Sequence, residues 1–364
     1  MARALRAEAG HATAPVTALS RWTAEWERHE ATWIAWPHNT RDWPGKFAPI
    51  PWVYGEVVRH LARGETVRIL VGSAGEEARA RRLLGRVGAD LARVGFFRIP
   101  TDRSWTRDYG PLFARREAPA GGMEIVRFRF NGWAKYPQWR RDDEVPARVA
   151  RALEVPLAPV RAAGRDVVLE GGAVDGNGRG ALLTTEECLL DPLTQVRNPG
   201  LSRAGMEQVL RDALGVSQVI WLGQGIAGDD THGHVDDVCR FVGPRTVVLG
   251  EEKDPRDANH RPLAENRERL QGVRLADGSA LEVVPLPMPS SLTLDGRRLP
   301  ASYANFYVAN AAVLVPTFND PSDRLALGIL GELFRDRPVI GIHAVDLVWG
   351  LGTLHCMTRE QPAA

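Results

Sequence analysis

The sequence predicts an α/β fold, and three observations lead to that prediction. Short runs rich in β-branched residues alternate with amphipathic stretches of helical period over most of the 364 residues. Hydrophobic residues make up 44% of the chain, which is enough to bury a large core. No Ser/Gly-rich linker or block of charge divides the sequence. We therefore expect one catalytic domain over residues 20–364, although length alone would suggest about two domains.

Each predicted element rests on its own pattern. Apolar runs, several of them ending at a Gly or Pro that starts a loop, predict strands over residues 66–72, 165–172, 217–223, 245–250 and 311–318. Amphipathic stretches, two of them preceded by a Ser or Asp that could cap the helix, predict helices over residues 75–88, 142–154, 202–215 and 321–336.

Charge and composition exclude several classes of protein. The formal net charge is +1, so no field draws the chain onto nucleic acid or an anionic membrane. No apolar run reaches the ~18 residues of a transmembrane helix. Residues 1–19 lack the apolar core of a secretory signal, and we expect a disordered tail there. The three cysteines are too scattered for a disulfide framework or a zinc ribbon, which favours a reducing cytoplasm.

Two common α/β functions lack their glycine signatures. No G-x-G-x-x-G follows a predicted strand, and no G-x-x-x-x-G-K-[ST] is present. These motifs bring backbone close to a dinucleotide or to the phosphates of a nucleotide. The sequence therefore supports neither a dinucleotide-binding nor a P-loop fold.

Four stretches carry polar residues at or after predicted strands, where loops on a rigid scaffold often hold functional groups. They are SWTRDYGPLF (104–113), VLEGGAVDGNG (168–178), GIAGDDTHGHVDDVCRF (225–241) and GLGTLHCMT (350–358). In the third, His234 and Asp236 are two residues apart, so an extended segment would point both to one face, together with His232.

One interpretation of this histidine cluster is a metal site. H-x-H-x-D begins the zinc ligand set of several hydrolases. The metallo-β-lactamase pattern, however, needs a further His where this chain has Asp237. Later ligands would have to come from His260 or His343, neither of which lies in a motif. The metal interpretation is thus the weaker of two.

The other interpretation joins His234 to Cys356. A thiol is a strong nucleophile only as its thiolate, which a neighbouring imidazolium favours. The Gly-rich turn before Cys356 would allow a ligand to approach closely. Cys188 and Cys239 are expected to be small buried hydrophobes. His355 is expected to face away from the site, because neighbouring residues of an extended segment alternate sides.

Three carboxylates indicate the ligand. Asp108, Glu170 and Asp236 would repel one another in one low-dielectric pocket unless a cation completed it. A planar guanidinium with its fork of N–H donors matches two carboxylates. The sequence therefore suggests a cysteine that attacks a guanidinium.

These residues resemble the agmatine deiminase family, which includes the bacterial peptidyl-arginine deiminase type, within the guanidino-group-modifying superfamily. The motifs that carry the resemblance run from about residue 20 to the end of the chain: EWERHEATWIAWPHN (25–39), WTRDYGP (105–111), LEGG (169–172), GDDTHGHVDD (228–237), ASYANFYVAN (301–310) and GLGTLHCMT (350–358). The resemblance implies a five-bladed α/β propeller, the pentein fold. The matching site positions are Asp108, Glu170, His234, Asp236, Asn305 and Cys356.

By this resemblance, Asp108 and Asp236 would hold the guanidinium, and Glu170 would support the clamp and orient His234. Cys356 would attack the central carbon, and His234 would protonate the departing ammonia. Trp105 and Asn305 would contact substrate, and neither a metal nor an organic cofactor is implied. Asp229 and Asp230 are expected to hold loops or the far end of the substrate.

The implied reaction converts agmatine to N-carbamoylputrescine in putrescine synthesis, and arginine or peptidyl-arginine is the alternative substrate. A homo-oligomer is possible. The chain departs from the family pattern at Leu351, Thr353, Arg359 and Glu360, positions expected near the pocket.

Overall fold

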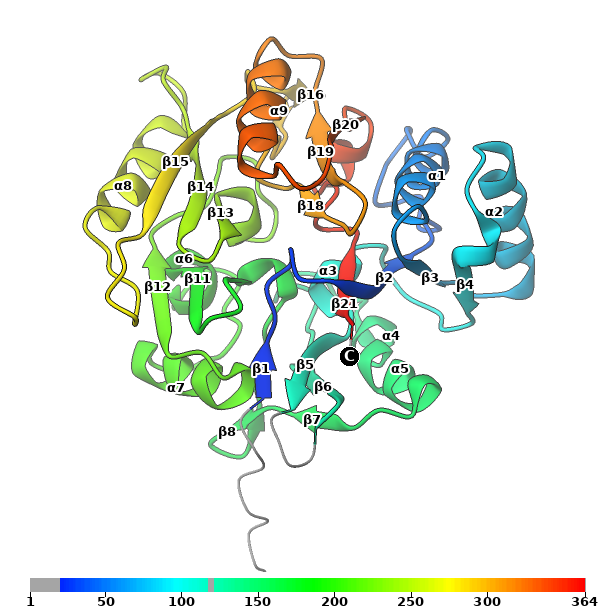
Figure 1. Cartoon of the computed structure of the whole chain (residues 1–364), viewed down its shortest axis with the longest axis horizontal. Helices are drawn as coiled ribbons and strands as arrows, with labels where there is room; N and C mark the ends of the chain where they lie inside the picture. Colours follow the sequence, from blue (N-terminus) through cyan, green and yellow to red (C-terminus); the bar gives the residue numbers. More distant parts are fainter. Residues whose placement is uncertain (1–19, 117–120, 364) are drawn as a thin grey trace, which may run out of the picture.

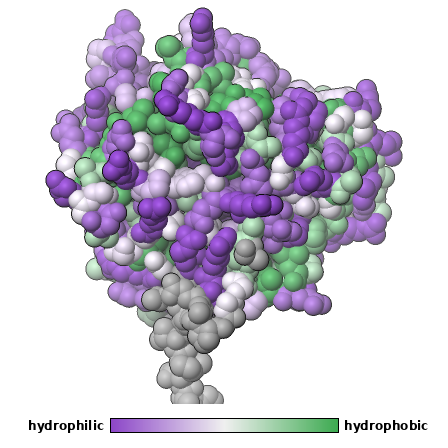
Figure 2. All heavy atoms as spheres, viewed as in Figure 1, coloured by the Kyte–Doolittle hydropathy of each residue, from purple (hydrophilic) through white to green (hydrophobic). Residues whose placement is uncertain are grey.

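The computed structural model describes residues 20–116 and 121–363, so the expected tail over residues 1–19 lies outside the described residues. Figure 1 shows helices on the periphery and strands nearer the centre of the molecule. Figure 2 shows a face covered largely by hydrophilic side chains, with hydrophobic ones gathered in smaller areas. Within the described ranges, no helix combines the length and apolar character needed to cross a bilayer.

The described residues form five sheets of three or four strands, and each sheet repeats one connectivity. In each sheet two strands pair antiparallel, and the second of them pairs with a third strand that runs parallel to it. The first sheet has the order β21 (Arg359–Pro362), β2 (His29–Ala35), β3 (Thr66–Leu70), β4 (Val94–Phe97). The second has the order β1 (Ser20–Trp22), β5 (Leu112–Arg116), β6 (Met123–Arg127), β7 (Leu157–Pro159).

The other three sheets are shorter. They consist of β10 (Asp175–Gly176), β11 (Ala181–Thr185) and β12 (Gln218–Leu222); β13 (Cys239–Gly243), β14 (Thr246–Glu251) and β15 (Glu282–Pro287); and β18 (Tyr307–Val308), β19 (Val313–Thr317) and β20 (Val339–His343). Two small hairpins are added by β8 (Arg161–Ala162) with β9 (Arg165–Asp166) and by β16 (Thr293–Leu294) with β17 (Arg297–Arg298).

Helices connect the parallel partners, as a parallel pair requires. They are α1 (Ile50–Leu61), α2 (Ala74–Arg86), α4 (Arg140–Asp143), α5 (Val145–Leu153), α6 (Glu186–Leu190), α7 (Arg203–Leu214), α8 (His260–Leu270) and α9 (Ser322–Leu333). The short α3 (Thr106–Tyr109) and the 3₁₀ turns η1 (Leu91–Arg93), η2 (Gly171–Ala173), η3 (Val235–Asp237) and η4 (Leu347–Gly350) lie in loops.

Local chemistry explains the helix ends. The Ser202 side chain accepts a hydrogen bond from the Gly205 N–H and so begins α7, as the sequence predicted. Gly215, with a φ of 66°, ends α7 in the left-handed region that glycine adopts without strain. The predicted helix over 142–154 is divided, because α4 ends at Asp143 and Val145 begins α5.

The predicted strand over 165–172 is wrong. Only Arg165–Asp166 form a strand, and Gly171–Ala173 form a 3₁₀ turn. The Asn198 side chain accepts from the backbone N–H of Val168 (2.9 Å) and donates to its carbonyl (2.8 Å). On its other side the stretch pairs with Arg129 only as an isolated parallel bridge, and on the Val168 side the Asn198 side chain takes the place of a neighbouring strand. The other predicted strands agree with β3, β12, β14 and β19 to within a few residues.

The two ends of the described chain meet in one sheet. Strand β21 pairs antiparallel with β2, and Trp33 lies opposite Arg359. This pairing lies near the centre of the molecule in Figure 1. It brings the segment after Cys356 beside residues that begin the described chain, so the site combines both ends of the sequence.

Candidate active site

The Cys356 thiol lies in the turn between η4 and β21 and is 6% exposed. Asn305 Nδ2 donates to its sulfur (3.2 Å), and Asp236 Oδ2 lies 3.9 Å from the sulfur. Asn305 Oδ1 in turn accepts from the Thr353 hydroxyl (2.7 Å). Asn305 therefore contacts the sulfur directly, and the contact with substrate that the sequence predicts for it stays a prediction.

A cavity of about 290 Å³ opens in front of this sulfur. Besides Cys356, its lining consists of Arg41, Asp42, Pro44, Arg103, Trp105, Asp108, Trp133, Tyr136, Asp230, Thr231, Arg297, Trp349, Gly350, Leu351 and Gly352. The predicted positions Trp105, Asp108 and Cys356 thus share one cavity. Aromatic walls with a carboxylate and a thiol suit a flat cationic ligand.

Two carboxylates are held firmly beside the sulfur. Asp108 Oδ2 accepts from Trp133 Nε1 (2.9 Å), and its Oδ1 accepts from the Gly172 N–H (3.1 Å). Asp236 Oδ2 lies 2.6 Å from His355 Nδ1. In the described part of the chain, Asp236 Oδ1 is buried without a hydrogen-bond partner. A buried carboxylate oxygen without a partner is costly, so it points to a donor supplied by the ligand.

The His234 ring lies between two further carboxylates. Its Nδ1 is 3.7 Å from Asp108 Oδ1, and its Nε2 is 3.8 Å from Glu170 Oε2. Glu170 Oε1 accepts from Arg197 Nε (3.2 Å), and both side chains are fully buried. Asp229 shapes the loop by accepting from the backbone N–H of His234 (3.1 Å), as expected.

Gly172 shows how closely these groups converge. A Cβ atom built on it would lie 2.5 Å from His234 Nδ1, 2.9 Å from Asp108 Oδ1 and 3.0 Å from Asp236 Oδ2. Real Cβ atoms do not approach other atoms this closely. The second glycine of LEGG is therefore required because three polar side chains meet over its backbone.

Substituting Gly172 with Ala should lower kcat by roughly 100-fold, because displacing a reacting group by about 1 Å has that effect. The control is Gly85→Ala in α2, where an added Cβ meets no atom within 4 Å. That variant should keep full activity and unfold at the same or a slightly higher temperature. Steady-state ammonia release and thermal unfolding check both, and a fully active Gly172→Ala enzyme would contradict the placement of His234.

Burial and charge set the protonation of the site. Burial opposes ionisation of Glu170, but Arg197 and then His234 outweigh it and hold its pKa at about 2. Burial likewise opposes the imidazolium, but Asp108, Cys188 and Glu170 raise the pKa of His234 well above its usual value. His234 therefore carries a proton that it can donate.

The thiol and the nearest acids behave differently. Burial raises the pKa of Cys356 well above its usual value, and the carboxylates of Asp236, Asp237 and Asp108 raise it further. Burial raises the pKa of Asp108 to about 6, although His234 opposes the rise. The pKa of Asp236 is lowered, because His355 outweighs the effect of burial. A cation bound between these carboxylates would offset their effect on the thiol and favour the thiolate.

A buried ionic network that the sequence did not predict supports Asp236. His355 Nε2 lies 2.8 Å from Glu25 Oε2. Glu25 also accepts from Arg107 (2.9 Å) and Arg240 (3.0 Å). His355 does face away from the cavity, as expected, but it contacts Asp236 directly. The stretch around Glu25 also contains Glu27, Arg28, His29 and Glu30, so nothing in the local sequence singles out Glu25.

Two further expectations about this region are wrong. His232 does not share a face with His234, because His232 (φ 66°) and Gly233 (φ 89°) are in the left-handed region and the segment is not extended. His232 Nε2 lies instead 2.8 Å from Asp191. Glu360 does not lie near the pocket but pairs with Arg107 (2.6 Å) in the buried network.

The glycines of the turn before Cys356 leave space for tryptophan rings as well as for a ligand. A Cβ on Gly352 would lie 2.9 Å from the Trp105 ring, and a Cβ on Gly350 would collide with Trp43. The Trp43 and Trp105 ring centroids are 5.2 Å apart. Gly350 and Gly352 thus permit the wall that contains Trp105 to form.

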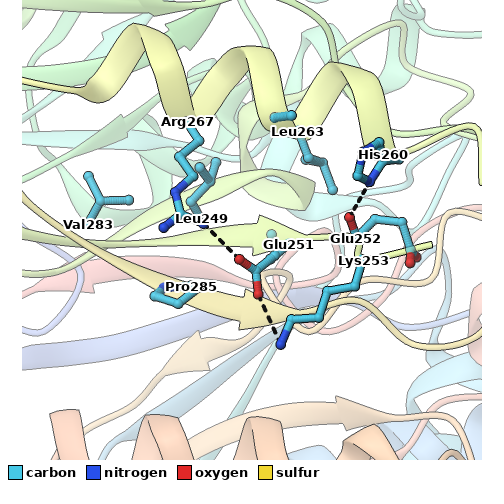
Figure 3. A pocket seen from close by; sticks show the side chains of 11 residues that line it. Leu249, Glu251, Glu252, Lys253, His260, Leu263, Arg267, Val283 and Pro285 are labelled. Carbon is cyan, nitrogen blue, oxygen red and sulfur yellow. Dashed lines mark hydrogen bonds and ion pairs between the residues drawn. The ribbon is translucent and has the colours of Figure 1, made fainter. Parts of the chain in front are cut away.

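A second pocket, of about 270 Å³, lies between α8 and strands β14 and β15. Figure 3 shows that Glu251 there faces Arg267 and Lys253, while His260 faces the Glu252 backbone. No group of three potential metal ligands in the described residues joins His260 or His343 to His234. The metal site suggested for the H-x-H-x-D sequence therefore lacks its later ligands.

Comparison with known proteins agrees with this geometry. A model of the Porphyromonas-type peptidyl-arginine deiminases matches residues 21–362. The chain belongs to this family. It is 36% identical to an agmatine deiminase of Stutzerimonas stutzeri, over 93% of this chain and 95% of that protein.

Solved structures of family members have the same fold. An agmatine deiminase of Enterococcus faecalis, solved as catalysing its reaction, is 30% identical with a TM-score of 0.86, covering 94% of this chain and 96% of that chain. A variant agmatine deiminase of C. jejuni with substrate bound is 27% identical with a TM-score of 0.83, covering 94% and 96%. The family fold is the mixed α/β pentein fold, as the sequence predicted.

Proposed function

We propose that this protein hydrolyses agmatine to N-carbamoylputrescine and ammonia through a covalent thiouronium on Cys356. The observation that carries the proposal is the convergence of His234, Asp108 and Asp236 over Gly172, beside the Cys356 thiol. The close identity to agmatine deiminases over almost the whole chain supports agmatine as the substrate.

In the first half of the reaction, the guanidinium lies between Asp108 and Asp236 and donates to Asp236 Oδ1, the buried oxygen without a partner among the described residues. Its charge favours the thiolate, and the thiol proton passes to solvent as the guanidinium binds. The thiolate adds to the central carbon. His234 protonates one nitrogen, which leaves as ammonia.

In the second half, the neutral His234 takes a proton from water, and the resulting hydroxide adds to the thiouronium carbon. Collapse breaks the C–S bond, and the hydroxyl proton returns to the sulfur. The ammonia released in the first half takes up a proton from solvent as ammonium, which balances the proton that the thiol lost. Because the ureido group of the product is uncharged, it loses the attraction that held the guanidinium, which promotes release.

Lowering the pH through about 6 should reduce kcat/KM. Protonation of Asp108, whose pKa is raised to about 6, removes one anion that holds the guanidinium. Since kcat/KM reports the free enzyme, it should fall about tenfold per pH unit below that value. Measurements of kcat/KM over pH 5–8 test this. Asp108→Asn is the control, because the residual kcat/KM of that variant should not show this fall below about pH 6. A wild-type profile that is flat across pH 6 would contradict the assignment.

Arginine or a peptidyl-arginine is the second candidate substrate, and the cavity mouth supports it. Arg41 lines the cavity and, in the described residues, has no ion-pair partner. The Asp230 carboxylate, in contrast, already accepts hydrogen bonds from Lys135, Arg297 and Tyr136. A free guanidinium at the mouth would suit a substrate carboxylate. Ammonia release from agmatine, arginine and a peptide with C-terminal arginine decides between them, and agmatine should have the highest kcat/KM.

We also propose that the five sheets are the blades of a pseudo-fivefold propeller within one catalytic domain over residues 20–364. The repeated strand connectivity supports this arrangement, as does the placement of the sheets about the centre of Figure 1. The proposed reaction places the protein in putrescine synthesis. All three cysteines are free thiols, which supports the expected cytoplasmic location.

A further inference from the structure

We propose that Glu170, Cys188 and His234 form an inhibitory site for a thiophilic divalent ion, zinc being the physiological example. The inhibition rests on the proposed function, because the ion would occupy the catalytic imidazole. The binding itself does not, and it requires no part of Cys356.

Three segments far apart in sequence supply the site. Glu170 precedes η2, Cys188 lies in α6, and His234 precedes η3. All three are buried, and one ligand atom from each lies within 4.8 Å of the other two. Among residues 20–116 and 121–363, this is the group of three potential ligands that meets such a limit. Cys188 was expected to be an inert buried hydrophobe, but its sulfur faces the catalytic histidine and acid.

The polar atoms of this group lack partners in the described structure. Glu170 Oε2 and both nitrogens of His234 are buried without hydrogen bonds. His234 Nε2 and Glu170 Oε2 are 3.8 Å apart, which is too far for a hydrogen bond. Zinc bonds to nitrogen and oxygen are each about 2.0–2.2 Å. An ion between the two atoms could therefore contact both with little movement of either side chain.

Neighbouring charged side chains lie against two of the proposed ligands, Glu170 and His234. Glu170 Oε1 is held by Arg197, which leaves Oε2 for an ion. The other nitrogen of His234 faces Asp108 Oδ1 at 3.7 Å, an arrangement of carboxylate and imidazole that recurs behind zinc ligands. Asp108 also lines the substrate cavity, so one residue in contact with His234 borders that cavity.

The donor set selects the ion. A thiolate with an imidazole favours zinc or cadmium, whereas magnesium and calcium require oxygen ligands. The positive charge of Arg197 beside Glu170 disfavours any cation that cannot gain a strong bond to sulfur. When the ion binds, Cys188 and Nε2 of His234 each give up a proton to solvent. The ion then holds the lone pair of His234, so His234 can no longer accept the proton from water.

The test measures binding in Cys356→Ser protein, which makes turnover unnecessary and excludes the nucleophile as a ligand. Isothermal titration with zinc should find one site per chain. Adding Cys188→Ser or Cys188→Ala should raise Kd by more than about 100-fold, because outer partners of metal ligands alone contribute about 10–100-fold. Cys356→Ser with Cys239→Ser is the matched control, since Cys239 is a buried free thiol of β13. That control should bind zinc normally.

Two more measurements complete the test. Cadmium should produce an ultraviolet thiolate-to-metal absorption band in Cys356→Ser protein, and the band should vanish with Cys188→Ala. Far-ultraviolet circular dichroism confirms that each variant folds, and His234→Gln provides a second ligand variant should Cys188 substitutions unfold the chain. Zinc should inhibit wild-type ammonia release reversibly, with recovery on chelation.

The proposal is overturned if Cys356→Ser protein does not bind zinc, or if folded Cys188→Ala and His234→Gln variants bind it unchanged. Ammonia release measured in chelator reports on the proposed function alone. An active enzyme that does not bind zinc would therefore refute the ion site and leave the deiminase proposal standing.

Discussion

Replacing Cys356 with Ser should reduce kcat for ammonia release from agmatine by more than about 10⁴-fold, the scale expected when a nucleophile is lost. Serine keeps the size and position of the side chain beside Asn305, so the fold should be retained. A hydroxyl surrounded by three buried carboxylates ionises far less readily than a thiol, and the covalent step therefore fails. Coupled detection of ammonia measures the effect.

The control for this variant is Cys239→Ser. Cys239 is fully buried in β13, and its hydroxyl analogue should cost some stability but little activity. If Cys356→Ser turned over agmatine at a rate near that of the wild type, the covalent mechanism would be wrong.

Replacing Asp236 with Asn should lower kcat/KM by about 10²–10⁴-fold, because breaking a buried charge pair costs about 3–5 kcal/mol. The carboxylate holds His355 through Oδ2 and offers the buried Oδ1 to the guanidinium. An amide there supplies no negative charge to the substrate and leaves His355 with a poorer partner. Steady-state kinetics with agmatine, together with a fluorescence or calorimetric Kd for guanidinium, measures both losses.

Asp230→Asn provides the comparison, since Asp230 lines the cavity in front of Cys356 but already accepts from Lys135, Arg297 and Tyr136. Its effect on kcat/KM should stay below about tenfold, as for an exposed ion pair. Equal losses from the two substitutions would mean that charge in the cavity, and not contact with Asp236, governs binding.

Much of the fold was predictable because its helices and strands have clear periodicity. The strands at 66–70 and 313–317 are apolar runs, and α7 begins at a serine that caps it. The failure over 165–172 has a physical reason. Asn198, which is 30 residues away from Val168, satisfies the backbone there, and no local pattern reveals such a partner.

The candidate site was predictable by residue type and less so by geometry. Asp108, His234 and Cys356 stand out because polar residues follow strands at these positions. The roles of Glu25 and Arg107 were missed, because an ion pair is recognised only once both ends of the chain are brought together by β2 and β21. His232 was misplaced because His232 and Gly233 adopt left-handed backbone, so the segment that leads to His234 is not an extended strand.

The most direct measurement of the central claim is mass spectrometry of enzyme quenched with acid during turnover of agmatine, followed by peptide mapping. The account predicts an adduct on Cys356 whose mass equals that of agmatine less ammonia, and His234→Gln enzyme, which lacks the acid for the departure of ammonia, should form this adduct more slowly than the wild type. An active enzyme that shows no adduct on Cys356 at any time of quenching, or one that carries the adduct on Cys188 or Cys239, would contradict it.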